Sequence, residues 1–184
     1  MTESDSLRID YRDHERVRRI LDRVTYCLEG ISIEFDRWDE EYVRGPGLYF
    51  AVVSGSSVAD YADPMGTNRW PVEECPVVDA DEDAFYAAAR DVATSRDGAV
   101  VVAVDGSIHG QMVRFRDRPA ADDAVTYADW MGSRHMSAAD TSVREEVVAT
   151  LTLSEETGRV CVFVDGEFSE QDRSTLAEGW RGED

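Results

Sequence analysis

The chain contains no lysine, and its 39 acidic residues outnumber the 19 basic residues, which are all arginines. The formal net charge is −20. Self-repulsion at this charge is relieved when salt shortens the Debye length, to about 3 Å near 1 M. Because the acids are spread along the whole chain, we expect a halophilic prokaryote as the source; an acidic protein that binds basic partners is the alternative. No basic stripe is visible, so nucleic acid is not an expected partner.

Cysteine is scarce and long apolar runs are absent. Cys27, Cys75 and Cys161 have no C-x-x-C spacing and lie beside apolar residues, which predicts buried thiols in a reducing compartment. No apolar run reaches the length of a membrane span, so we expect no contact with a membrane. The polar, acidic first residues lack the pattern of a secretory signal. We therefore expect a cytoplasmic protein.

Three widespread catalytic motifs are also absent. The chain has no G-x-x-x-x-G-K-[ST], no G-x-G-x-x-G and no H-E-x-x-H. A phosphate-binding P-loop, a dinucleotide fingerprint and a zinc-protease helix are thereby excluded as the basis of its chemistry.

The apolar pattern predicts an α/β fold, in a single domain with a central mixed β-sheet of about six or seven strands flanked by helices. The 184 residues suit one domain. We expect residues 1–12 to be disordered or loosely attached and residues 13–184 to form the domain. It should begin with a helix over 14–29, stopped by Gly30, and end with a helix capped by Ser169.

Between these helices the sequence alternates between strand and helix signals. Apolar runs predict strands over 31–35, 47–53, 99–104, 108–115, 147–153 and 159–168. Residues 81–95 have helical spacing, with Asp79 or Asp81 as the N-cap. Residues 54–74 are expected to be a long connection or to contain a short edge strand. Asp105-Gly106-Ser107 between apolar runs predicts a hairpin.

The first polar cluster, Asp97-Gly98-Ala99, stands between a predicted helix and a predicted buried strand. An aspartate in this place can hold a metal or accept a proton, and glycine lets a ligand approach the backbone. The alternative is a turn aspartate that bonds nearby backbone.

The second cluster is Gly132-Ser133-Arg134-His135. Ser133 could cap a helix whose first N–H groups point at an anion. Arg134 adds a fork of donors that suits phosphate, and His135 adds a donor that can be neutral or charged. The alternative is a capped surface helix.

The third cluster, Ser154-Glu155-Glu156-Thr157-Gly158, lies between two predicted strands. Adjacent carboxylates point in different directions, so we expect one of them to enter a site. That carboxylate could bind Mg²⁺ or Mn²⁺ through oxygen. The alternative is a hairpin turn with solvated acids.

In chain order, the three clusters resemble the diadenylate cyclase domain, a family that joins two ATP molecules into cyclic di-AMP. The marks of that family are a D-G-A motif opening a buried strand, an R-H-R motif after Gly-Thr or a similar pair, and a strand ending in residues like S-E-E-T-G. The matching stretches here are residues 97–106, 132–139 and 152–166, and the similarity covers about residues 45–168.

The resemblance implies a role for each cluster. Asp97, Arg134 and His135 would be catalytic, and Asp97 with Glu156 would hold Mn²⁺ or Mg²⁺. The nucleotide-binding residues would be Gly98, Ala99, Gly132, Ser133, Arg134, His135, Ser154 and Glu155. ATP would be the substrate. Because the product has two identical halves, the chain would associate with itself, with the active faces of two subunits juxtaposed.

One position departs from the family pattern. Met136 stands where the R-H-R motif has its second arginine, and a methionine cannot donate to phosphate. Arg114, Arg116 or Arg144 could compensate. The alternatives to an active cyclase are a catalytically weak or inactive nucleotide-binding sensor of the same fold, and another phosphate-transfer enzyme such as a nucleotide hydrolase.

Overall fold

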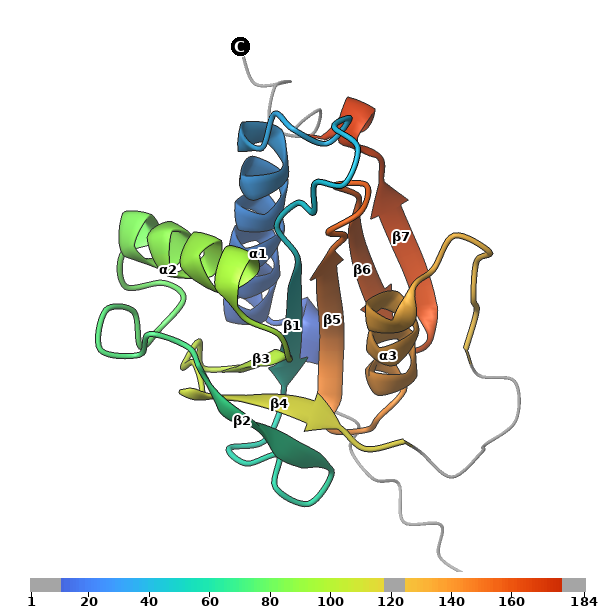
Figure 1. Cartoon of the computed structure of the whole chain (residues 1–184). Coiled ribbons are helices and arrows are strands. Elements are labelled where there is room, and N and C mark those ends of the chain that lie inside the picture. Colours follow the sequence, from blue (N-terminus) through green and yellow to red (C-terminus); the bar gives the residue numbers. More distant parts are fainter. Residues whose placement is uncertain (1–10, 118–124, 177–184) are drawn as a thin grey trace, which may run out of the picture.

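A computed structural model describes residues 11–117 and 125–176 of the chain (Figure 1). Its centre is a five-stranded sheet in the order β3-β1-β5-β6-β7. The strands are β1 (Leu48–Val53), β3 (Val100–Ala103), β5 (Val147–Leu153), β6 (Val160–Val164) and β7 (Glu167–Gln171). β1 and β3 are parallel and the other neighbours are antiparallel, so the sheet is mixed.

A separate two-stranded sheet consists of β2 (Ala62–Arg69) and β4 (Gln111–Phe115), paired antiparallel. The helices are α1 (Glu15–Glu34), α2 (Glu82–Ser95) and α3 (Ser133–Ser142), with short 3-10 helices at Tyr11–Asp13 and Arg173–Thr175. The α/β class and the mixed sheet are confirmed. The central sheet is smaller than expected, because two of the seven described strands pair with each other instead of joining it.

The two faces of the central sheet pack against different elements. All six residues of β1 are buried, and successive side chains point to opposite faces. Leu48, Phe50 and Val52 belong to a core cluster with α1 and α2. Tyr49, Ala51 and Val53 belong to a second cluster with α3 and the β2–β4 sheet. Figure 1 shows α3 on the opposite side of the sheet from α1.

The helix α1 runs past the predicted stop at Gly30 and continues to Glu34, so the strand predicted over 31–35 is wrong. Its buried face, which includes Ile20, Val24, Leu28 and Ile31, keeps helical spacing through the glycine. A Cβ on Gly30 would lie 2.9 Å from the Tyr86 ring, so the glycine allows α1 to approach α2 closely.

The predicted hairpin around Asp105-Gly106-Ser107 forms, and its two arms are joined by isolated antiparallel bridges. The Ala103 N–H donates to the Ser107 carbonyl at 2.9 Å, and Gly106 has φ of +90°. Beyond the turn, Ala99 and Val113 still exchange backbone hydrogen bonds at 2.7 and 3.0 Å. β4 also pairs with β2, within the stretch expected to be a connection or an edge strand. The cavity described below borders this β2–β4 sheet.

The C-terminal region differs from the expected helix. Glu167–Gln171 is a strand that pairs with β6, where the sequence predicted one long strand followed by a helix capped by Ser169. Asp165 and Gly166 both have positive φ, which forms a tight turn between β6 and β7. Residues 177–184, which include the end of that predicted helix, and residues 1–10 of the predicted loose N-terminus lie outside the described residues.

Candidate active site

The three polar clusters line one cavity of about 720 Å³, between α3, the β2–β4 sheet and the turn after β5. Every predicted site residue lies along it: Asp97, Gly98, Ala99, Gly132, Ser133, Arg134, His135, Ser154, Glu155 and Glu156. Segments almost sixty positions apart in the chain therefore meet in a single space. The three clusters are therefore neighbours in the fold.

Asp97 lies just before β3, with its side chain 75% exposed to the cavity. Its Oδ1 accepts a hydrogen bond from the Gly98 N–H at 2.8 Å, and its carbonyl accepts one from Asn68 Nδ2 at 2.8 Å. Gly98 has φ of +105°, and a Cβ there would lie 2.9 Å from Met65. The D-G-A segment thus holds a solvated carboxylate in a fixed place.

The N-terminus of α3 opens onto the same cavity. Gly132 is the N-cap and makes no side-chain cap hydrogen bond, so the expectation that Ser133 caps the helix is wrong by one residue. Tyr49 Oη donates to the Ser137 carbonyl at 3.4 Å and Thr150 Oγ1 to the Ala138 carbonyl at 2.7 Å. These bonds fix the helix on the sheet with its positive end toward the cavity.

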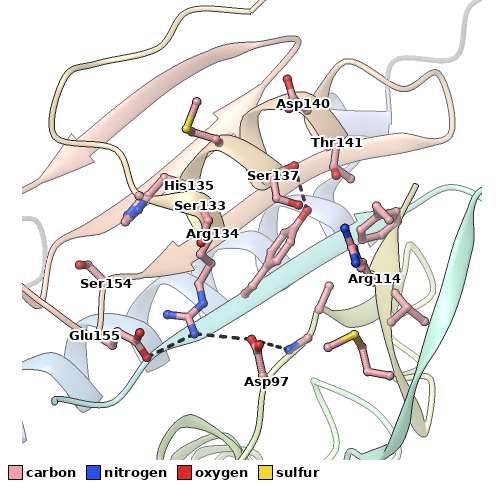
Figure 2. Close-up of a pocket in the computed structure, with 18 of the residues that line it drawn as sticks. Asp97, Arg114, Ser133, Arg134, His135, Ser137, Asp140, Thr141, Ser154 and Glu155 are labelled. Carbon is pink, nitrogen blue, oxygen red and sulfur yellow. Dashed lines mark hydrogen bonds and ion pairs between the residues drawn. The ribbon is translucent and has the colours of Figure 1, made fainter. Parts of the chain in front are cut away.

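The guanidinium of Arg134 lies between two carboxylates (Figure 2). Its Nη2 is 3.7 Å from Asp97 Oδ1 and 3.5 Å from Glu155 Oε2. One side chain from α3 therefore connects the first and third clusters. The side chain is 20% exposed, which leaves part of the fork accessible from the cavity.

His135 is 6% exposed and packs edge-on against Trp130, with ring centroids 5.2 Å apart. Burial, and then the positive charges of Arg134 and Arg159, lower its pKa to about 4. The imidazole is therefore neutral at pH 7. Its Nε2 is buried and has no hydrogen-bond partner among the described residues, although the residue lines the cavity. The neutral imidazole therefore adds no charge to the cavity.

The turn after β5 is built by its own side chains. Ser154 Oγ accepts from the Glu156 and Thr157 N–H groups at 3.3 Å, so this hydroxyl shapes the turn. Ser32 of α1 donates to the Gly158 carbonyl at 2.6 Å and anchors it from below. Both Glu155 and Glu156 line the cavity, whereas we expected only one carboxylate to enter it.

The structure adds residues that the sequence analysis did not place in the site. Tyr49, Trp130, Asp140, Thr141 and Arg159 line the cavity. For Asp140 the signal was in the sequence, because Ser133, Ser137 and Asp140 recur at helical spacing along α3. Trp130 gave no such signal, since it gains its place by packing beneath Arg159, whose guanidinium carbon is 4.1 Å from the ring centroid.

Five arginines line the cavity, and four of them are held by protein groups. Arg116 bonds Asp63, Arg159 bonds Asp172, and Arg134 pairs as described. Arg144 donates to the Arg116 carbonyl and lies over the Tyr61 ring. Arg114 is exposed and makes no salt bridge within the described part of the chain. Of the three arginines named as compensation for Met136, Arg114 is the one available to a ligand.

The carboxylates fit a divalent cation that arrives with a ligand better than a resident one. Among residues 11–117 and 125–176, no group of three or more His, Cys, Asp or Glu side chains could hold a metal ion. Asp97 and Glu156 can each offer oxygen to the cavity. Mg²⁺ is commonly held by one or two carboxylates together with substrate phosphates, which is the arrangement these residues permit.

The comparisons with known proteins agree with this architecture. No protein-family model and no curated protein sequence matches the chain. A double mutant of DacA from Staphylococcus aureus, a diadenylate cyclase, matches with a TM-score of 0.52 and 17% identity, over 90% of this chain and 97% of that one. The chain has the fold of DacA. The sequence resemblance and the structural likeness thus point to the same architecture.

A second solved structure is similar to the same degree. It is a hypothetical membrane-spanning protein from Bacillus cereus, with a TM-score of 0.56 and 16% identity. The match covers 82% of this chain but 62% of that one, so the chain spans less than two thirds of the Bacillus cereus chain. In the described residues of the present chain, no helix is both long and apolar enough to cross a membrane.

Proposed function

We propose that the protein is a diadenylate cyclase, which condenses two ATP into cyclic di-AMP and two pyrophosphates. The observation that carries this proposal is the meeting of Asp97, Arg134, His135 and the 154–158 turn around one cavity. The DacA fold supports it. The need for ATP makes the cytoplasm the proposed location, and a halophilic source remains our explanation of the net charge of −20.

In this proposal the triphosphate lies at the N-terminus of α3. The helix dipole and the uncapped N–H groups after Gly132 favour an anion there. Arg134 would exchange Asp97 and Glu155 for phosphate oxygens, which its planar fork of donors suits. His135, being neutral, would add a hydrogen bond through its unpartnered Nε2 once a shift of the ring exposes that buried nitrogen to the ligand.

The reaction is an attack of the ribose 3′-hydroxyl of one ATP on the α-phosphate of the other. A new P–O bond forms, the bond to pyrophosphate breaks, and the hydroxyl proton passes toward the carboxylate of Asp97 or to water. Mn²⁺ or Mg²⁺ held by Asp97 and Glu156 would supply charge stabilisation at the phosphates. Positioned donors contribute most where charge develops on phosphoryl oxygens.

A single cavity cannot close a product with two identical halves. Two subunits must present their cavities to each other across a two-fold axis, so that each 3′-hydroxyl meets the facing α-phosphate. We therefore propose ATP as the substrate and a second copy of this chain as the partner. A monomer would bind ATP without turnover.

A specific observation favours a second candidate, a weak or inactive nucleotide sensor. Met136 lines the cavity where the family motif has an arginine, and it is 43% exposed. The lost donor would weaken the hold on phosphate. Arg114 on β4 is the exposed arginine that could replace it, and its presence in the cavity favours the enzyme.

The deciding experiment is incubation with ATP and Mn²⁺ in about 1 M KCl, where charge repulsion is screened, with the products separated by chromatography. Cyclic di-AMP supports the cyclase, bound but unchanged ATP supports the sensor, and ADP or AMP alone indicates a hydrolase. Asp97→Asn should reduce product formation at least about a hundredfold, as expected for loss of an acid–base group. Asp22→Asn, on the exposed face of α1, is the matched control.

A further inference from the structure

The segment Arg44-Gly45-Pro46-Gly47, just before β1, touches two of the proposed site residues. A Cβ on Gly47 would lie 2.4 Å from Arg134 Nη1, 3.1 Å from Arg134 Cζ and 3.0 Å from Glu155 Cβ. The backbone of Gly47 therefore forms the surface against which the guanidinium lies. The Arg134 side chain, which pairs with Asp97 and Glu155, fills the space that this glycine leaves open.

The same segment also holds Glu155. The Gly45 N–H donates to the Glu155 carbonyl at 2.9 Å, and Arg44 Nη1 is 3.6 Å from Glu155 Oε1. One oxygen of the Glu155 carboxylate thus faces Arg44 and the other faces Arg134. The carboxylate is fixed between two guanidinium groups, one from each side.

The segment cannot easily move away from Arg134. Pro46 and Gly47 are buried, and the Gly47 N–H donates to the Ala93 carbonyl of α2 at 2.9 Å. Leu48, the next residue, is already part of the central sheet. If a side chain were added at position 47, the guanidinium, as the end of a flexible side chain, would move most, and Glu155 Cβ at 3.0 Å would shift slightly.

We propose that Gly47 is a positioning residue of the candidate site, which acts by leaving the guanidinium of Arg134 its place between Asp97 and Glu155. The role requires space and not an unusual backbone, so alanine would fit the chain but displace Arg134. This inference rests on the proposed function, because it assigns Arg134 to the triphosphate. Neither the sequence motifs nor the fold comparison pointed to residues 44–47.

The test compares binding of ATP with binding of adenosine, by calorimetry without turnover. Gly47→Ala should weaken ATP binding about tenfold, the size expected for one charge-assisted contact, and leave adenosine binding unchanged. Gly30→Ala is the matched control, since its Cβ would also meet a side chain at 2.9 Å, but on α1 away from the cavity. An equal loss of ATP and adenosine binding, or no loss, would overturn the proposal.

A double-variant cycle separates positioning from a general structural role. If Gly47 acts through Arg134, then Gly47→Ala/Arg134→Gln should bind ATP as Arg134→Gln alone does. Additive losses would contradict the proposal. If Gly47→Ala alone fails to fold, the double variant should fold, because glutamine lacks the Nη1 that clashes with the added Cβ. A double variant that also fails to fold would contradict the proposal. Wild-type protein that binds ATP but makes no cyclic di-AMP would overturn the proposed function alone.

Discussion

The two faces of the central sheet differ in what they bury. The face toward α1 and α2 carries an almost wholly apolar cluster in which Phe50, Trp70 and Phe85 pack ring against ring, with centroids 5.7 to 6.0 Å apart. The face toward α3 has a smaller apolar cluster and a cavity beside it. One face closes the core, and the other supports the proposed site.

The difference appears residue by residue along β5. Leu151 and Leu153 pack with the α1 cluster, whereas Thr150, just before Leu151 and on the opposite face, donates to the Ala138 carbonyl of α3. A hydrogen bond fixes the direction of a helix more closely than apolar packing does. The polar residues on this face hold α3 so that its N-terminus, with Arg134 and His135, meets Asp97.

The largest loss of stability is expected when a side chain is truncated on the face toward α1 and α2. This variant tests whether the two faces of the sheet have different roles. Phe50→Ala should destabilise the protein by about 3–5 kcal/mol, because a fully buried ring leaves a cavity between α1, α2 and the sheet. Its neighbour Tyr49 faces α3, and Tyr49→Phe, which removes only a hydroxyl, should cost about 1 kcal/mol. Urea unfolding measures both. Similar losses for the two variants would contradict a division of labour between the faces.

The fold was predictable where the apolar residues followed a single helical or strand pattern. The α2 range and its Asp81 cap followed from helical spacing, and the buried runs of β1 and β5 followed from their length. The strand prediction for residues 31–34 failed because Ile31 and Ile33 fit both a strand and the last turn of a helix, and in the fold Ile31 continues the buried face of α1. The turn at Asp165-Gly166 did carry a hairpin signal, which was read as part of one strand.

The site was predictable as three clusters but not as a geometry. The order of the motifs placed Asp97, Arg134 and Glu155 in one proposed site. That Arg134 lies between the two carboxylates depends on how α3 settles on the sheet, and no local pattern contains that information. Gly47 and Trp130 were missed for the same reason, because each has its place only through tertiary contacts.

The neutral His135, on the face toward α3, should make the stability of the protein depend on pH. Because the pKa of His135 falls to about 4 in the fold and is about 6.5 in an unfolded chain, only the unfolded chain binds the proton between these values. The unfolding free energy should therefore decrease as pH falls from 6.5 toward 4. His135→Gln should show a smaller decrease in urea unfolding at constant high salt. Equal decreases in the variant and the wild type would mean that His135 is not held neutral.

The smallest expected effect concerns Met136, on the face toward α3. A substitution here tests whether the cavity belongs to an active cyclase or to a sensor. It is exposed on the first turn of α3, with its N–H bonded to the Gly132 carbonyl, so an arginine fits there without disturbing the core. If the cavity is a weakened family site, Met136→Arg should leave ATP turnover equal or raise it a few-fold, since one more donor faces phosphate. Arg19→Met on α1 serves as the control for a change of charge outside the cavity. A sharp loss of turnover in Met136→Arg would show that the methionine packs against a specific partner. Position 136 would then not correspond to the second arginine of the family motif.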